Sequence, residues 1–119
     1  MQIPVFLLRK LYVKGSLANV DGGFQFKIKN SLSPGTATAV EPIKVNDNEY
    51  ALDTTTIMSD DNEISATEVS ESNSFPIKVG VEITMFVKSD PLPEGEHKID
   101  ISLTTKETGK LAFDIKDSI

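Results

Sequence analysis

The sequence predicts an all-β fold, namely an antiparallel β-sandwich of the jelly-roll-like type with at most one or two short helical turns. Two observations carry this prediction: apolar residues recur at every second position in four runs, and turn-forming residues separate the runs. A period of two places apolar side chains on one face of a strand and polar side chains on the other. Such two-faced strands are typical of antiparallel sheets. We expect one sandwich domain spanning residues 1–119.

The four alternating runs predict the principal strands, at residues 24–29, 79–87, 98–105 and 111–116. Shorter strands are expected at 12–17, 42–45 and 49–52. Turn residues lie between these segments, and glycine, asparagine and aspartate there tolerate the positive φ of tight turns. The predicted turns are Asp21-Gly22-Gly23, Asn46-Asp47-Asn48, Pro93-Glu94-Gly95 and Glu107-Thr108-Gly109.

Helical structure is expected only as isolated turns. Pro4 suits the first position of a turn that runs to Arg9, and Ser65 is suited to cap a turn that contains Glu68 three residues later. Neither segment is long enough to be stable alone. The polar stretch at 58–74 predicts a loop region over the sandwich, with room for one short strand.

Composition excludes several classes of function. The chain has 18 acidic and 12 basic residues, and its net charge of -6 disfavours binding to nucleic acids and to anionic membranes. It contains no cysteine, which excludes disulfides and thiolate metal sites and fits a reducing cytoplasm. The apolar run at 5–8 is too short for a membrane span, which needs about 20 residues. We therefore expect a cytoplasmic protein without a cofactor.

His97 is the sole histidine and hence the one candidate for a general base or an imidazole metal ligand. The alternative is a half-exposed residue at the start of a strand. We favour this alternative because a metal site around one histidine would need carboxylates from elsewhere in the chain. A minimal enzyme that uses His97 remains a further hypothesis.

The densest acidic cluster supplies candidate metal ligands, Asp60, Asp61 and Glu63. Hard cations such as calcium bind oxygen ligands on loops. These residues nevertheless lack the alternating spacing and the central glycine of an EF-hand. A solvated turn is therefore the favoured interpretation, and no serine-hydrolase or phosphate-binding motif is present elsewhere.

A protein partner is the leading functional expectation, with Phe6, Phe75 and Phe86 as candidate interface residues. Phe86 falls on the otherwise polar face of its predicted strand. It would mark a partner surface if exposed, or it would be covered by other parts of this chain. A small-ligand or carbohydrate-binding module is the alternative, although the chain has no tryptophan and only Tyr12 and Tyr50 as tyrosines for stacking on sugars.

Three ordered motifs resemble a known family. They are Lys14-Gly15-Ser16-Leu17-x-Asn19-Val20 followed by Gly23-Phe24-x-Phe26, then Val45-Asn46-Asp47-x-Glu49, and finally Leu92-x-x-Gly95-x-His97-x-Ile99. Together they resemble the small (β) subunit of C-glycoside deglycosidases and related short archaeal and bacterial proteins of unknown function. This resemblance implies a non-catalytic accessory β-sandwich, associated either with itself or with a larger, metal-dependent TIM-barrel subunit that carries the chemistry.

The chain is also similar to short archaeal proteins that are labelled hydroxymethylglutaryl-CoA reductase. That enzyme needs a nicotinamide site and a much larger fold. No segment of this sequence resembles a dinucleotide-binding motif, so reductase activity is not expected of this chain.

Overall fold

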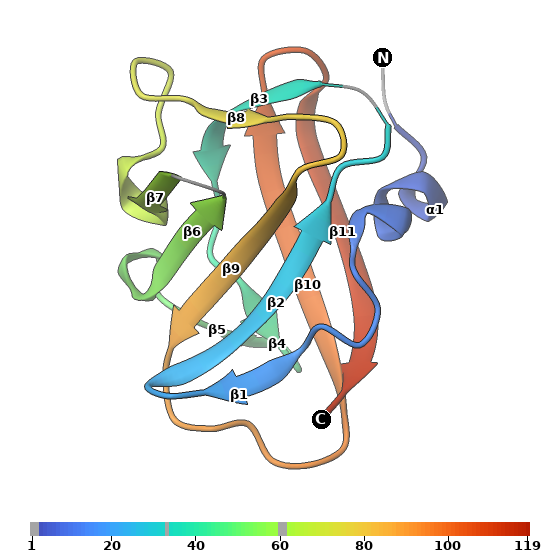
Figure 1. Cartoon of the computed structure of the whole chain (residues 1–119), viewed down its shortest axis with the longest axis vertical. Coiled ribbons are helices and arrows are strands. Elements are labelled where there is room, and N and C mark those ends of the chain that lie inside the picture. Colours follow the sequence, from blue (N-terminus) through green and yellow to red (C-terminus); the bar gives the residue numbers. More distant parts are fainter. Residues whose placement is uncertain (1–2, 33, 60–61) are drawn as a thin grey trace.

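The fold consists of two antiparallel sheets packed face to face, as seen in a computed structural model that describes residues 3–32, 34–59 and 62–119 (Figure 1). The predicted all-β sandwich is therefore confirmed. The first sheet contains, in spatial order, β1 (Ala18–Val20), β2 (Gly23–Lys29), β9 (Glu82–Lys88), β6 (Thr55–Ser59) and β7 (Asn62–Ser65).

The second sheet is built around one long strand, β10 (Glu96–Thr105). One edge of β10 pairs along its length with β11 (Gly109–Ser118). Its other edge pairs with β4 (Lys44–Val45) near the start of the strand and with β3 (Gly35–Val40) near its end. The outer strands β5 (Asn48–Glu49) and β8 (Phe75–Ile77) complete this sheet.

The hydrophobic core lies between the two sheets and follows the alternation in the sequence. In β2, Phe24 and Phe26 are fully buried, while Gln25 between them is only partly covered. In β10, Ile99 and Ile101 are buried in the same way. These side chains face the opposite sheet because every second residue of a strand points to the same face.

The β10–β11 hairpin forms where the sequence predicts it. Thr105 pairs with Gly109, which has a φ of +75°, and the Thr108 N–H donates to Thr105 Oγ1 at 3.1 Å. The predicted turn at Asn46 and Asp47 also forms, and both residues have positive φ. These turns are encoded locally because asparagine, aspartate and glycine adopt that region at little cost.

The first predicted short strand is placed wrongly. The strand before the Gly22 turn is β1, at Ala18–Val20, whereas Tyr12 forms only an isolated bridge with Ile28. The physical reason is Gly15, whose φ of +83° turns the chain and interrupts the extended segment. A carboxylate on β11 then accepts the N–H groups of Gly15 and Leu17, while the Val13 N–H still donates to the Lys27 carbonyl on β2.

Three other predicted boundaries also change. Val79 is 50% exposed and precedes β9, because Gly80 adopts a φ of +82° in a turn. The predicted strand at 49–52 shrinks to β5 and is followed by the 3-10 turn η2 (Leu52–Thr54). The polar stretch at 58–74 contains more structure than a loop, because β6 and β7 form a hairpin there and η3 (Ala66–Glu68) follows. Ser65 Oγ accepts the Thr67 N–H, which confirms the predicted cap.

The N-terminal segment covers one open side of the sandwich. It comprises α1 (Val5–Leu8), with Pro4 at its N-cap rather than inside the helix, and the 3-10 turn η1 (Arg9–Leu11). Leu8 is buried, and Arg9 binds the outer edge of β11, where its Nε and Nη2 donate to the carbonyl and carboxylate oxygens of Asp114. None of the helices in the described ranges is long and apolar enough to cross a membrane.

Candidate functional site

His97 lies in the core-facing row of β10 rather than on the surface, with only 3% of its area exposed. Its Nε2 lies 2.7 Å from the carbonyl oxygen of Pro93, and its Nδ1 lies 2.8 Å from Nδ2 of Asn46. A carbonyl oxygen only accepts hydrogen bonds, so Nε2 carries the proton and donates.

The orientation of Asn46 fixes the other ring nitrogen of His97. The backbone N–H of Lys98 donates to the side-chain oxygen Oδ1 of Asn46 at 3.0 Å. The backbone N–H of Asn46 donates in return to the Lys98 carbonyl at 2.8 Å. The amide nitrogen of Asn46 therefore faces His97 and donates to Nδ1, which must be unprotonated. Both ring nitrogens are thus occupied in a neutral imidazole that joins the β4–β5 turn to the loop before β10.

This geometry favours the structural interpretation of His97. A general base or a metal ligand needs a ring nitrogen with a lone pair directed at a substrate or an ion. Here the one lone pair is occupied by Asn46, and the hydrogen bonds of the ring go to an amide and a carbonyl, with no carboxylate involved. An open groove lies beside this pair, lined in part by Asn48, Tyr50 and Asp90.

Replacing His97 with alanine is expected to lower the free energy of unfolding by about 1–3 kcal/mol, because two hydrogen bonds that contribute about 0.5–1.5 kcal/mol each are lost. Chemical denaturation followed by circular dichroism measures this change. Asn46→Ala should destabilise the chain to a similar degree, and the double variant should cost less than the sum of the two, because the residues share one interaction. Additive effects would contradict the proposed bridge.

A second polar cluster surrounds Asp117, which the sequence analysis missed. Its Oδ2 accepts hydrogen bonds from the Tyr12 hydroxyl at 2.7 Å and from the N–H groups of Gly15 and Leu17 at 3.0 and 3.2 Å. Its Oδ1 accepts the Ser118 N–H at 2.8 Å. This carboxylate holds the N-terminal segment against β11.

The environment shifts the pKa of both partners. Partial burial raises the pKa of the Asp117 carboxyl, but the hydrogen bonds from Tyr12 and from backbone N–H groups lower it more, so the net pKa lies below its ordinary value. The pKa of Tyr12 is raised, first by burial and then by its hydrogen bond to Asp117. The pair therefore stays a phenol and a carboxylate at neutral pH, an arrangement that fixes structure.

The acidic metal candidates gain no support from the part of the chain that can be described. Asp60 and Asp61 lie outside the described residues. Glu63 is exposed on β7 and lies opposite Met58. Within the described ranges, no group of three histidine, aspartate or glutamate side chains is placed to hold a metal ion.

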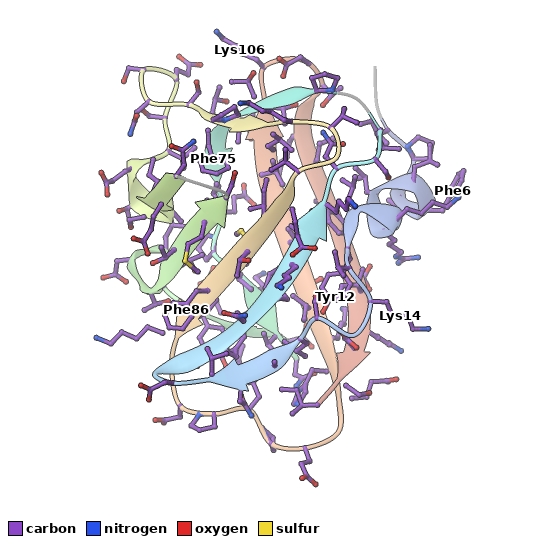
Figure 2. All side chains as sticks on the ribbon, viewed as in Figure 1. Phe6, Tyr12, Lys14, Phe75, Phe86 and Lys106 are labelled. Atoms are coloured by element: carbon purple, nitrogen blue, oxygen red, sulfur yellow. The ribbon has the colours of Figure 1, made fainter. Side chains whose placement is uncertain are left out.

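The three interface candidates differ in exposure. Phe6 is 62% exposed and projects away from α1 (Figure 2). Phe75 is 4% exposed and belongs to the core, so it offers no surface to a partner. Phe86 is half-buried between its cross-strand neighbours Gln25 and Thr56 on the outer face of the first sheet.

Neither tyrosine offers a platform for a sugar. Tyr12 is buried, with its ring 5.9 Å from that of Phe26. Tyr50 is half-buried, and its ring meets the ring of Phe24 edge-on, with 5.3 Å between the ring centroids. Because sugar-binding sites stack ligands on exposed aromatic faces, these tyrosines give the carbohydrate-binding alternative no support.

Comparison with protein families matches residues 7–119 to the family described as hydroxymethylglutaryl-CoA reductase, N-terminal domain. The chain belongs to this family. The expected relationship to the C-glycoside deglycosidase small subunit, and to proteins of unknown function, is therefore wrong. No curated protein matches the chain.

Membership of this family supports the expectation that the chain is a non-catalytic structural domain. The missing nicotinamide site argues only against catalytic activity of this chain, whereas the match concerns the N-terminal domain of the enzyme. The sandwich therefore corresponds to the N-terminal domain of the enzyme, and its relationship to the enzyme does not rest on an active site in this chain.

The motifs behind the mistaken resemblance have structural roles at one end of the sandwich. Asn19 exchanges two hydrogen bonds of 2.8 Å with the backbone of Leu92. Gly95, with a φ of +124°, exchanges two backbone hydrogen bonds with Ile119. Asn46 and His97 form the bridge described above. These residues join loops of the fold, so their presence does not identify a function.

Proposed function

We propose that this chain is a non-catalytic docking domain of a hydroxymethylglutaryl-CoA reductase and that α1 contacts the catalytic part of that enzyme. The observation that carries this proposal is the exposure of two large apolar side chains on one short helix. Phe6 is 62% exposed and Val5 is 45% exposed.

The composition of α1 supports a covered position. Its sequence is Val-Phe-Leu-Leu, with no polar residue on any side. A helix that is apolar all round is normally covered all round. In this chain Leu8 packs into the core, while Phe6 points away from it. An exposed aromatic side chain of this kind is the type of residue that anchors protein interfaces.

The family supports the choice of partner. The matched domain is named as the N-terminal part of hydroxymethylglutaryl-CoA reductase, so a catalytic region of that enzyme is the natural neighbour of the sandwich. A second copy of this chain could also cover Phe6 and is the alternative outcome of the experiment below.

Replacing Phe6 with aspartate is expected to weaken binding to the purified catalytic domain of the reductase from the same genome by about 30-fold or more, because a buried aromatic anchor is worth about 2 kcal/mol or more. Isothermal titration calorimetry measures the affinity. Val79→Asp is the matched control, because Val79 is a similarly exposed apolar residue that lies outside α1, in the turn before β9. Its affinity should equal that of the unmodified chain.

Three results would overturn the proposal: the unmodified chain does not bind the catalytic domain, both variants bind equally well, or light scattering shows that Phe6 instead mediates self-association. Circular dichroism of each variant confirms that folding is intact, which is expected because both side chains are largely exposed.

A further inference from the structure

An apolar cavity of about 100 Å³ lies between the two sheets. Its walls come from both layers of the sandwich. Ile57, Ile83 and Met85 contribute from the first sheet, and Ile101 and Phe113 contribute from the second. All five side chains are buried and belong to the hydrophobic core.

The size and chemistry of this cavity favour an apolar occupant over water. A single buried water needs roughly 10–15 Å³ on the same measure and two to four polar partners. This cavity is several times larger, and its walls are mainly aliphatic and aromatic carbon. Apolar cavities in proteins stay dry and accept molecules such as benzene or xenon.

One wall of the cavity lies along the side of the sandwich between β2 and β11. Half-buried Ile28 on β2 and Leu111 on β11 line it there, together with Ile3 and Leu11 of the N-terminal segment. This segment spans the gap between the sheets, since α1 contacts β11 and Tyr12 bridges to Ile28 on β2. This wall is therefore formed by a short stretch of chain rather than by a sheet, and a movement of that stretch is the route by which we expect a ligand to enter.

The charged side chains that line the cavity favour an uncharged ligand. The only ionisable side chains among the described lining residues are Glu41 and Glu107, both exposed and acidic. Glu41 pairs with Lys110, and Glu107 accepts the Thr36 N–H. No lysine or arginine from the described ranges lines the cavity to receive an acidic head group. A buried carboxylate would thus remain unpaired, which is strongly unfavourable.

From these observations we infer that the sandwich binds a short, neutral alkyl chain between its two sheets. Phe6 itself does not line the cavity, so octanol binding can be tested independently of the proposed docking function. Binding would fill the space that core packing leaves open and would stabilise the folded state, because a ligand that binds only the folded chain adds to its stability.

The test is a titration of the full chain with octanol, followed by the NMR signals of the isoleucine and methionine methyl groups. We expect saturable shifts for the methyl groups of Ile57, Ile83 and Met85, together with a higher melting temperature. Octanoate has the same chain length with a carboxylate, and it should bind at least about tenfold more weakly. The inference would be overturned if octanol produced no saturable shifts, or if octanoate bound with the same affinity as octanol.

Filling the cavity gives the second arm of the test. Ala37 is buried and lines the cavity, so Ala37→Leu should leave the melting temperature unchanged or raised and should weaken octanol binding by about tenfold or more. Ala112→Leu is the matched control, because Ala112 is exposed on β11 outside the cavity. It should bind octanol like the unmodified chain, and equal binding by both variants would contradict the site.

A third variant keeps the inference falsifiable if Ala37→Leu does not fold. Ile57→Val removes one methyl group from the cavity wall and leaves room for more of the ligand. Octanol should then produce a larger increase in melting temperature than it does in the unmodified chain. A smaller increase, with the fold intact, would contradict binding at this position.

Discussion

Replacing Gly23 with alanine is expected to lower the free energy of unfolding by about 3 kcal/mol or more. A Cβ on Gly23 would collide with the backbone carbonyl of Val87 on the neighbouring strand β9. The obstacle is backbone rather than the end of a flexible side chain, so the two strands would have to separate. Chemical denaturation followed by circular dichroism measures the loss.

Gly35→Ala is the matched control for this prediction. Gly35 is also a strand glycine, at the start of β3, but an added Cβ would meet only side-chain atoms at ordinary contact distances, namely Thr105 Cγ2 at 3.9 Å and Glu107 Oε1 at 4.0 Å. This substitution should change stability little, or raise it by up to about 1 kcal/mol, because alanine restricts the unfolded chain. Equal destabilisation by both variants would show that the contact at Val87 is not decisive.

Replacing Asp117 with alanine should lower the free energy of unfolding by about 2–3 kcal/mol, because the Tyr12 hydroxyl and the N–H of buried Leu17 lose a charged acceptor. Asp114→Ala on the same strand is the control. The Asp114 carboxylate pairs with Arg9 at the surface, where such pairs contribute about 0–1 kcal/mol. Similar losses for the two variants would contradict the role assigned to Asp117.

Asp117 also makes the free energy of unfolding depend on pH in the acidic range. Its pKa is lowered in the folded chain, so its contribution is fully present above the ordinary carboxyl pKa of 3.8 and is lost as the pH falls through the lower folded value. Asp117→Asn should remove this part of the acid dependence. Thermal denaturation between neutral pH and the acid limb measures it, and an unchanged slope in the variant would refute the assignment.

The sandwich and its principal strands were predictable because they follow from local patterns. The alternation of Phe24 and Phe26 with polar residues reports which side of a strand faces the core, whatever the strand pairs with. The turn at Asn46 and Asp47 was equally predictable, since both residues readily adopt a positive φ. The sequence also excluded disulfides and thiolate metal sites outright, because it has no cysteine.

The functional role of single residues depended on partners that are distant in the chain. His97 and Asn46 are 51 residues apart, and Tyr12 and Asp117 are 105 residues apart. No local pattern marks such a pair, so the sequence left the partners of His97 open and did not single out Asp117. The motifs that suggested a deglycosidase subunit were misleading for the same reason, since their residues serve the joining of loops.

Sequence alone therefore determined that the chain folds as a two-layer β-sandwich, because burial alternates with strand period and turns have characteristic residues. Only the tertiary structure decided that Gly23 is required by its contact with β9 and that Phe75 is buried while Phe6 is exposed. It also revealed the apolar cavity between the sheets. Each of these properties depends on how segments that are far apart in the sequence pack against one another. A local sequence pattern does not specify that packing.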